Sequence, residues 1–329
     1  MNPPFFQFWH KTDSYIKKGE SPLEKRINYG GQAVIEGVMI RGKDHYSLAV
    51  RRPNGEITTK SSKLSSIYTG SLKNIPLIRG VIVLIETLVI GIQALTYSAN
   101  VALEEEGKEM SGWNMALMLG FSLSIGVGLF FIAPLIAIRS LDNFIASDGV
   151  SNLIEGLLRL SMFIGYIFLI GFLPDIRRVF AYHGAEHMTV HTHEHDLPLE
   201  TDQVRRFSTA HNRCGTAFLL VVMFVSVVVF VFIGRPSLPI SIVSRVILVP
   251  VIAGISYEII RLSGKYAENP LVKIIVYPSL ALQTLTTRQP DDSQIEVAIH
   301  AMKHAIAVDQ GTTEFGDTTE ASVKDEIGD

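Results

Sequence analysis

Long apolar blocks alternate along the chain with polar connections. Four of the blocks stay apolar over the roughly 20 residues that a helix needs to cross the hydrocarbon core of a bilayer. These blocks comprise residues 115–138, 153–173, 216–234 and 240–260. Within the second, Glu155 and Arg159 are four positions apart, so the two side chains can pair on one helix face. We therefore expect a mainly α-helical fold, a polytopic transmembrane bundle of about four to five spans in contact with the lipid bilayer.

A further apolar stretch, residues 75–100, carries a polar side chain at every seventh position: Glu86, Gln93 and Asn100. That spacing places the three side chains near one stripe of a helix. Two interpretations remain open. In the first, the helix lies at the membrane surface or inside the protein, with its stripe solvated. In the second, it spans the membrane and turns the stripe towards a membrane-buried site.

Residues 28–74 have the composition of a small strand-rich module. The stretch 33–40 is short and rich in β-branched residues. Residues 47–51 and 56–59 flank Pro53-Asn54-Gly55, a strong signal for a hairpin turn. We expect a β-rich cytosolic module at this position.

The chain changes character again after the last span. Residues 271–285 are apolar but contain Lys273 and Pro278, so we expect a segment that lies along the surface or packs in the bundle. Asp291 and its neighbours then cap an amphipathic helix, and the end of the chain is acidic and rich in small residues, which is typical of disorder. The predicted parts are an N-terminal arm at 1–27, the module at 28–74, a membrane domain at 75–285 with a histidine-rich loop at 174–215, a C-terminal helix at 286–308 and a disordered tail at 309–329.

Charge is scarce and unevenly placed. Only 19% of the residues are charged, against roughly 25% in an average soluble domain. Lys and Arg gather before the first span, in the loop 174–215 and after the last span. Because Lys and Arg favour the cytoplasmic side, both termini and this loop are predicted to be cytoplasmic, in a multi-pass protein of the cell membrane. That arrangement requires four full spans and an embedded or re-entrant helix at 75–100. The net charge of −3 predicts no partner, and no nucleic-acid motif is found.

The histidines suggest where chemistry takes place. Five of the ten fall within residues 183–195, in the loop between the second and third spans. If this segment is helical, His183, Glu186 and His187 share one face. Two imidazoles at i and i+4 can hold one divalent metal, and the acid between them can be a ligand or the base that acts on bound water. The order His-x-x-Glu-His matches the inverted zincin motif, a loose pattern whose third ligand must come from elsewhere.

His211 and Cys214, three positions apart and just before the next apolar block, are candidates for that ligand. Cys214 is the single cysteine, so it forms no intramolecular disulfide. Imidazole and thiolate together favour zinc or a similar divalent transition metal over magnesium or calcium. The predicted metal ligands are His183, His187 and either His211 or Cys214.

Ordinary explanations exist for each of these residues. A histidine run in a loop can be a solvated surface or a pH-sensitive contact with lipid headgroups, which suits His193 and His195 best. Cys214 can be a small buried residue, and Glu186 can pair with a nearby arginine. Gly184 weakens the case for a continuous helix.

Two acids elsewhere in the chain are candidates for the same site. Glu258, near the end of the last span, is the best distant candidate for a base or third ligand, with an ion pair to Arg261 as the favoured alternative. Glu36, expected on a strand, is an exposed strand residue or points into the site.

Four sequence blocks occur in a distinctive order. They are GQAVIEGVMIRG at 31–42, HGAEH at 183–187, HNRCGT at 211–216 and LTTRQPDD at 285–292. Together they resemble the DUF1385 family of bacterial membrane proteins, from about residue 28 to residue 305. The resemblance implies a metal-dependent enzyme, an inference that rests on the same His and Glu residues, and it supplies no substrate. The chain departs from the family at Met188, where a basic residue is usual, and His193, His195 and the acidic tail lie outside the resemblance.

Three functions are compatible with these observations. The first is a membrane-embedded metal-dependent hydrolase at the cytoplasmic interface, with Glu186 and Glu258 as catalytic candidates, a zinc-like cofactor and a lipid-linked or membrane-peptide substrate. The second is a non-catalytic membrane scaffold or assembly factor whose metal fixes the loop 174–215 to the bundle. The third, metal transport, ranks last because two of the four clear spans contain no charged residue.

Overall fold

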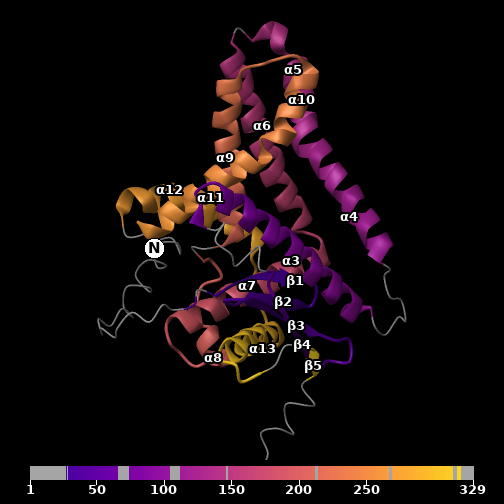
Figure 1. Ribbon diagram of the computed structural model, residues 1–329, viewed down its shortest axis with the longest axis vertical. Coiled ribbons are helices and arrows are strands. Elements are labelled where there is room, and N and C mark those ends of the chain that lie inside the picture. Colours follow the sequence, from indigo (N-terminus) through magenta and orange to yellow (C-terminus); the bar gives the residue numbers. More distant parts are fainter. Residues whose placement is uncertain are drawn as a thin grey trace, which may run out of the picture.

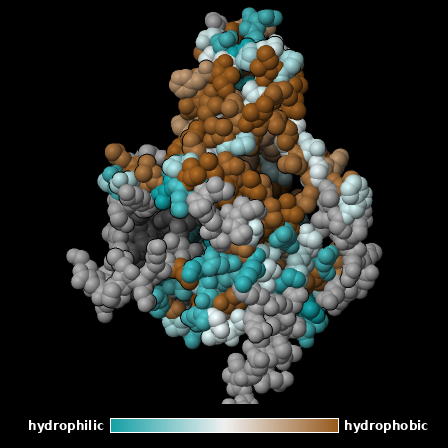
Figure 2. All heavy atoms as spheres, viewed as in Figure 1, coloured by the Kyte–Doolittle hydropathy of each residue, from teal (hydrophilic) through white to brown (hydrophobic). Residues whose placement is uncertain are grey.

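The computed structural model describes residues 27, 29–65, 74–103, 112–145, 147–211, 214–266, 269–313 and 317–319, so the predicted N-terminal arm lies almost wholly outside the described residues. Apolar helices form one end of the molecule, and a β-sheet with its covering helices forms the other (Figure 1). The space-filling view shows hydrophobic surface over the helical end and hydrophilic surface over the sheet end (Figure 2). The predicted mainly helical chain with a small N-terminal antiparallel sheet is confirmed.

The sheet is antiparallel, with its strands in chain order. They are β1 (Gly30–Val34), β2 (Gly37–Arg41), β3 (His45–Arg51), β4 (Ile57–Lys63) and β5 (Asp317–Thr319). The predicted hairpin at Pro53-Asn54-Gly55 joins β3 to β4, and Gly55 has the positive φ of 92° that this turn requires.

Two expectations about these strands were wrong. The continuous strand expected at 33–40 is interrupted by a tight turn at Ile35 and Glu36, where Glu36 has a φ of 52° and Val34 pairs with Gly37. Glu36 therefore lies in a hairpin turn and not on a strand. The tail was expected to be disordered, but its residues 317–319 pair with β4; those beyond 319 lie outside the described residues.

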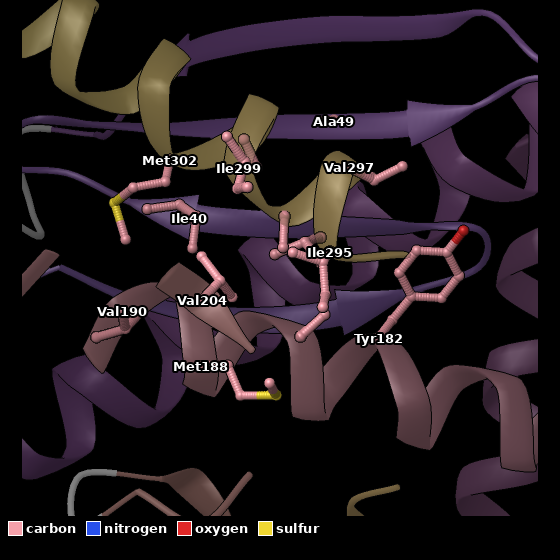
Figure 3. Packing of buried hydrophobic residues seen from close by; sticks show 14 of the residues in the cluster. Ile40, Ala49, Tyr182, Met188, Val190, Val204, Ile295, Val297, Ile299 and Met302 are labelled. Atoms are coloured by element: carbon pink, nitrogen blue, oxygen red, sulfur yellow. The ribbon is translucent and has the colours of Figure 1, made fainter. Parts of the chain in front are cut away.

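Helices cover both faces of the sheet. Helices α7 (Pro174–Glu194) and α13 (Asp292–Asp309) pack on one face, and α3 (Ile78–Ala102) packs on the other. Because successive side chains of a strand point to opposite faces, Val38 and Ile40 of β2 join the core with α7 and α13, whereas Met39 between them joins the core with α3. Figure 3 shows the first of these cores.

Helix α13 is the predicted amphipathic C-terminal helix. Its cap is the predicted Asp291, whose side chain accepts a hydrogen bond from the Gln294 backbone N–H at 2.9 Å while the Gln294 side chain accepts one from Asp291 N–H at 3.0 Å. The apolar face, which includes Ile295 and Met302, is fully buried against the sheet and α7.

The polar stripe of α3 faces the sheet. Glu86 is only 3% exposed and forms an ion pair with Arg41 of β2 at 2.7 Å, and Gln93 accepts a hydrogen bond from the Tyr46 hydroxyl at 3.2 Å. Of the two interpretations of this stripe, these contacts favour a helix packed inside the protein, but Glu86 is buried against the sheet and not solvated as that interpretation expected. The helix is nevertheless long and apolar enough to cross a membrane by length and composition.

The described residues contain four helices long and apolar enough to cross a membrane, or five if one bent pair counts as a single span. Besides α3 these are Leu117–Arg139, α6 (Asp148–Ile170) and α9 (Gly215–Ile233). The span Leu117–Arg139 consists of most of α4 (Gly112–Val127), a π-helical turn (Gly128–Ile132) and α5 (Ala133–Arg139). The bent pair is α10 (Leu238–Ile247) and α11 (Val249–Lys265). The span expected at 240–260 corresponds to this pair, which is bent: the two helices meet at 46°, where Pro250 cannot continue the backbone hydrogen bonds of α10.

Buried charges inside the bundle are paired. Glu155 and Arg159 of α6 form the predicted i,i+4 ion pair at 2.8 Å, and Arg245 of α10 binds the same carboxylate at 2.8 Å. Helix α12 (Pro270–Thr286), which contains Pro278, packs against α9 and α6, as the bundle alternative for 271–285 predicted.

The sheet, α7 with the short α8 (Thr201–Val204), and α13 pack together at one end of the molecule. The N-terminal module, helix α7 and the C-terminal helix therefore lie together on one side of the apolar bundle; their orientation relative to a membrane stays a prediction. The boundaries of the predicted parts stay a prediction.

Candidate metal centre

Helix α7 runs without a break through the histidine-rich segment. It begins at Pro174, which suits a first-turn position because its missing N–H is not needed there. Gly184 does not interrupt the helix. Instead it lets another segment approach closely, because a Cβ atom at this position would overlap with the carbonyl oxygen of Arg288. The Arg288 N–H donates to the Phe180 carbonyl at 2.9 Å, which fixes that segment against α7.

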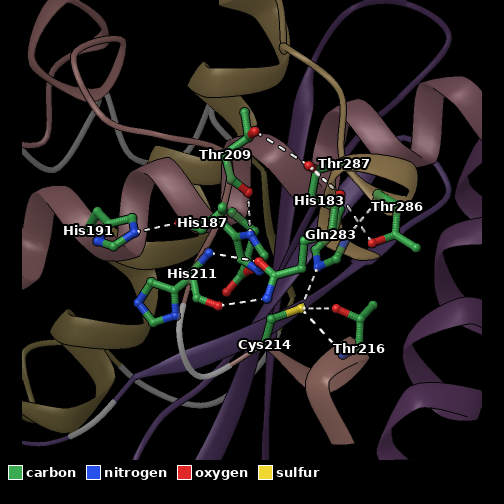
Figure 4. A network of polar contacts seen from close by, with 12 residues as sticks. His183, His187, His191, Thr209, His211, Cys214, Thr216, Gln283, Thr286 and Thr287 are labelled. Atoms are coloured by element: carbon green, nitrogen blue, oxygen red, sulfur yellow. Dashed lines mark hydrogen bonds and ion pairs between the residues drawn. The ribbon is translucent and has the colours of Figure 1, made fainter. Parts of the chain in front are cut away.

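His183 and His187 of α7 meet Cys214, which precedes α9 (Figure 4). One ligand atom from each of the three side chains lies within 4.8 Å of the other two. The His183 Nε2 atom is 3.2 Å from the Cys214 sulfur, and the two imidazole rings are 4.4 Å apart between centroids. We name this cluster the inner group.

Backbone carbonyls orient both imidazoles of the inner group. His183 Nδ1 lies 2.9 Å from the Thr286 oxygen, and His187 Nδ1 lies 2.6 Å from the Thr209 oxygen. Because a carbonyl oxygen only accepts, each Nδ1 carries the hydrogen and each Nε2 keeps its lone pair. Histidines that ligate metals commonly have this arrangement, in which the second ring nitrogen donates to a carbonyl or carboxylate.

The sulfur of Cys214 is held by the start of α9. Cys214 is the N-cap residue, and its sulfur accepts the backbone N–H of Thr216 at 3.4 Å and lies 3.1 Å from the Thr216 hydroxyl. The residue is buried, as the ordinary explanation for a cysteine at this place predicted, and it also contacts His183.

Glu186 lies under strand β1. It is 4% exposed, and its Oε2 atom is 3.5 Å from His187 Nε2. Gly31 of β1 leaves the space that this side chain needs, since a Cβ atom there would be 2.8 Å from the Glu186 Cγ.

His211 belongs to a different cluster from the one expected. Its imidazole groups with His191 and Glu194, whose ligand atoms also lie within 4.8 Å of one another, and the inner group takes Cys214 as its third member. The backbone of His211 is fixed by Gln283 of α12, a fully buried amide that accepts from His211 N–H at 2.8 Å and donates to its carbonyl at 2.9 Å.

Burial determines the charge of these histidines. Loss of solvation lowers the pKa of His187 and His211, and it lowers the pKa of His191 to about 3. Near pH 7 these three imidazoles are therefore neutral, the form that binds metals. The interpretation as a solvated surface applies only to His195, which is exposed, while His193 packs edge-on against the Tyr29 ring.

The structure places the two distant acids away from these groups. Glu258 binds Arg79 of α3 through two hydrogen bonds and accepts the Leu77 N–H at 3.2 Å, so its ion-pair partner is Arg79 and not the expected Arg261. Glu36 binds Arg178 of α7 and accepts from the Tyr182 hydroxyl at 3.2 Å. Neither acid belongs to a metal-capable group among the described residues.

A cavity of about 650 Å³ opens beside α7, next to the segment that carries Thr286. Three arginines line it, Arg177 and Arg178 of α7 and Arg288, together with Asp175 and with Phe172 in the turn between α6 and α7. Phe172 is 68% exposed, so the cavity joins a basic wall to exposed apolar surface.

The comparisons with known proteins agree on one family. A family model described as a protein of unknown function, DUF1385, matches residues 75–308, a range that contains three of the four blocks but not the one at 31–42. The uncharacterized protein YqhQ of Bacillus subtilis (strain 168) is 35% identical over 295 residues, which cover 85% of this chain and 93% of that protein. No solved structure matches. The chain belongs to the DUF1385 family.

Proposed function

We propose that this protein is a membrane-embedded, metal-dependent hydrolase whose metal is held by His183, His187 and Cys214. The observation that carries the proposal is the convergence of His183, His187 and Cys214, one ligand atom from each within 4.8 Å of the others, with both Nδ1 atoms bound to carbonyls and His183 Nε2 3.2 Å from the sulfur. Two nitrogens and one sulfur suit zinc best among the common divalent metals.

Three protein ligands leave a fourth position of a tetrahedral zinc open to water or substrate, which is typical of catalytic sites. When bound, such a metal acts as a Lewis acid and brings the pKa of a coordinated water to about 7. Glu186 is the residue placed to take up a proton, at its Oε2 atom 3.5 Å from His187 Nε2. Its burial keeps bulk water from competing for that position.

The surroundings of the centre support an amphiphilic substrate. The site lies at the end of the apolar bundle, and the arginine-lined cavity adjoins the segment that positions His183. Arginines bind phosphate and carboxylate groups through paired N–H donors, and exposed apolar surface beside them suits an acyl or prenyl chain. We propose a lipid-linked substrate with an anionic headgroup, processed on the cytoplasmic face of the cell membrane.

The test combines metal content with turnover. Full-length protein purified in detergent is analysed for zinc, and wild type and Glu186→Gln are assayed on membrane-extracted lipid-linked phosphates and on generic ester, phosphodiester and peptide substrates. We expect both proteins to hold metal and only the wild type to turn over.

Full activity in Glu186→Gln would remove that residue from the chemistry. Metal without any turnover across these substrates would favour the scaffold function, in which the inner group fixes the 174–215 loop to the bundle. Absence of metal from the wild type would refute the proposal altogether.

A further inference from the structure

A second cluster of metal-capable side chains continues the face of α7 by one helical turn. His191 follows His187 at i+4, Glu194 follows His191 at i+3, and His211 approaches from the segment before α9. One ligand atom from each lies within 4.8 Å of the other two. We name His191, Glu194 and His211 the outer group; the proposed function makes no use of it.

The outer group is oriented by the surrounding backbone in the same way as the inner group. His191 Nε2 lies 2.9 Å from the Ala210 oxygen and therefore carries the hydrogen, which leaves the lone pair on Nδ1. The main chain of His211 is fixed on both sides by the buried Gln283 amide. Two imidazoles and one carboxylate are a ligand set that zinc hydrolases use at catalytic positions.

A simple His–Glu ion pair is the competing explanation, because His211 Nε2 is 3.4 Å from Glu194 Oε2. That distance is long for a charge-assisted hydrogen bond, which is usually about 2.7–2.9 Å. The carboxylate and the imidazole approach each other as two ligands of one cation do.

The two groups adjoin each other. The rings of His187 and His211 are 5.6 Å apart between centroids, and those of His191 and His211 are 4.4 Å apart. Glu186 is 3.5 Å from His187 Nε2, on the side of the inner group. Two adjoining ligand sets are compatible with a two-metal hydrolase, in which the cations would stabilise the attacking and leaving oxygens together.

We infer that the centre is binuclear, with a second divalent transition metal bound by His191, Glu194 and His211. This inference rests on the proposed function, which supplies the first metal. The inner group is buried around a sulfur, whereas the Glu194 side chain is 31% exposed. The second cation would therefore be the more exchangeable one.

Zinc stoichiometry tests the inference. Full-length protein in detergent is loaded with zinc and dialysed, and the zinc content per chain is measured. The proteins compared are wild type, Glu194→Gln, His191→Ala and the control His195→Ala, whose imidazole is exposed at the same end of the helix. We expect two equivalents in wild type and control, and one in each of the other variants. One equivalent in wild type and in Glu194→Gln alike would overturn the inference and leave the proposed function standing; none in the wild type would refute both.

Cobalt substitution separates the two positions spectroscopically and guards against a variant that merely fails to fold. A thiolate ligand gives cobalt an intense ultraviolet charge-transfer band, and Cys214 is the single cysteine. Glu194→Gln should lose one equivalent of cobalt and keep this band, while Cys214→Ser should lose the band and keep one equivalent. Parallel loss of the band and of all metal in both variants would overturn the division into two positions.

Discussion

Gly184→Ala tests how the close packing of α7 supports metal binding. The added Cβ would overlap with the Arg288 carbonyl oxygen and would lie 3.1 Å from the Thr209 Cγ2 atom. Both neighbours belong to segments that position the inner group: Thr286 binds His183 two residues before Arg288, and the Thr209 carbonyl binds His187. One methyl group therefore pushes on both carbonyls that orient the imidazoles.

Two effects of this substitution can be separated by size. Overpacking costs about 1–3 kcal/mol, and replacing glycine by alanine inside a helix returns about 1 kcal/mol, so the fold should lose about 0–2 kcal/mol. Loss of the groups that orient metal-binding histidines typically weakens metal affinity about 10–100-fold. We expect the zinc dissociation constant to rise by that factor while the protein remains folded.

Competition with a chromophoric zinc chelator measures the affinity, and thermal unfolding of the metal-free protein measures the stability. Gly165→Ala in α6 is the matched control, since a Cβ atom there meets nothing within 4 Å. Unchanged zinc affinity in Gly184→Ala, with Gly165→Ala also unchanged, would refute the role assigned to the two carbonyls.

Three further predictions follow from other contacts. Burial lowers the pKa of His191 from 6.5 to about 3, so below pH 6.5 the unfolded chain binds a proton that the folded chain does not. Metal-free protein should therefore lose about 2 kcal/mol of stability from this residue between pH 7.5 and pH 5. His191→Gln should make denaturant unfolding less dependent on pH; the same pH dependence in variant and wild type would count against this. Arg41→Leu removes the arginine that pairs with the buried Glu86 carboxylate and should destabilise the protein by about 3 kcal/mol in denaturant unfolding. The double variant Arg41→Leu/Glu86→Leu should recover part of this loss, and a single variant as stable as wild type would contradict the prediction. Arg177→Gln, at the cavity, should weaken binding of phosphatidylglycerol about five-fold, as measured by native mass spectrometry. The control Lys303→Gln, at an exposed position of α13, should leave this binding unchanged. Equal effects of the two substitutions would show that the cavity does not bind the lipid.

The hydrophobic pattern predicted the helices well because each helix is long and its apolar residues are continuous. The hairpin at Pro53-Asn54-Gly55 and the cap at Asp291 were predictable for a similar reason, since the signals are local in the sequence. The turn at Glu36 was not predictable from its two central residues, because Ile35 and Glu36 are not typical turn formers; Gly37, which directly follows them, was the nearest turn signal and was included in the expected strand. The bend between α10 and α11 depends on Pro250, whose position inside an apolar block did not by itself distinguish a kink from a straight span.

The candidate centre was predictable only in part. The spacing of His183, Glu186 and His187 gave the helical face, and α7 is indeed a helix through that segment. The choice between Cys214 and His211 as partner of the two histidines depended on how α9 and α12 pack, a long-range contact that spacing does not encode. Backbone carbonyls such as that of Thr209 have no side-chain signature, so their contribution could not be read from residue types.

For several residues, only the packing of the fold explains why that residue type occurs at that position. The polar stripe of α3 was visible in the sequence, but the partner that decides its meaning, Arg41, is on a strand 45 positions earlier. Gly31 and Gly184 both allow a close approach by another element, at Glu186 and at Arg288 respectively. A glycine inside a strand or helix signals such an approach without naming the neighbour.

The identity of the atoms around zinc tests the inner group most directly. Zinc K-edge absorption of the loaded wild type should contain a sulfur scatterer at about 2.3 Å together with nitrogen scatterers near 2.0–2.1 Å. In Cys214→Ser the sulfur contribution should disappear while nitrogen remains. Zinc bound in the wild type through nitrogen and oxygen alone, with a spectrum unchanged in Cys214→Ser, would contradict the assignment of His183, His187 and Cys214 as the metal site.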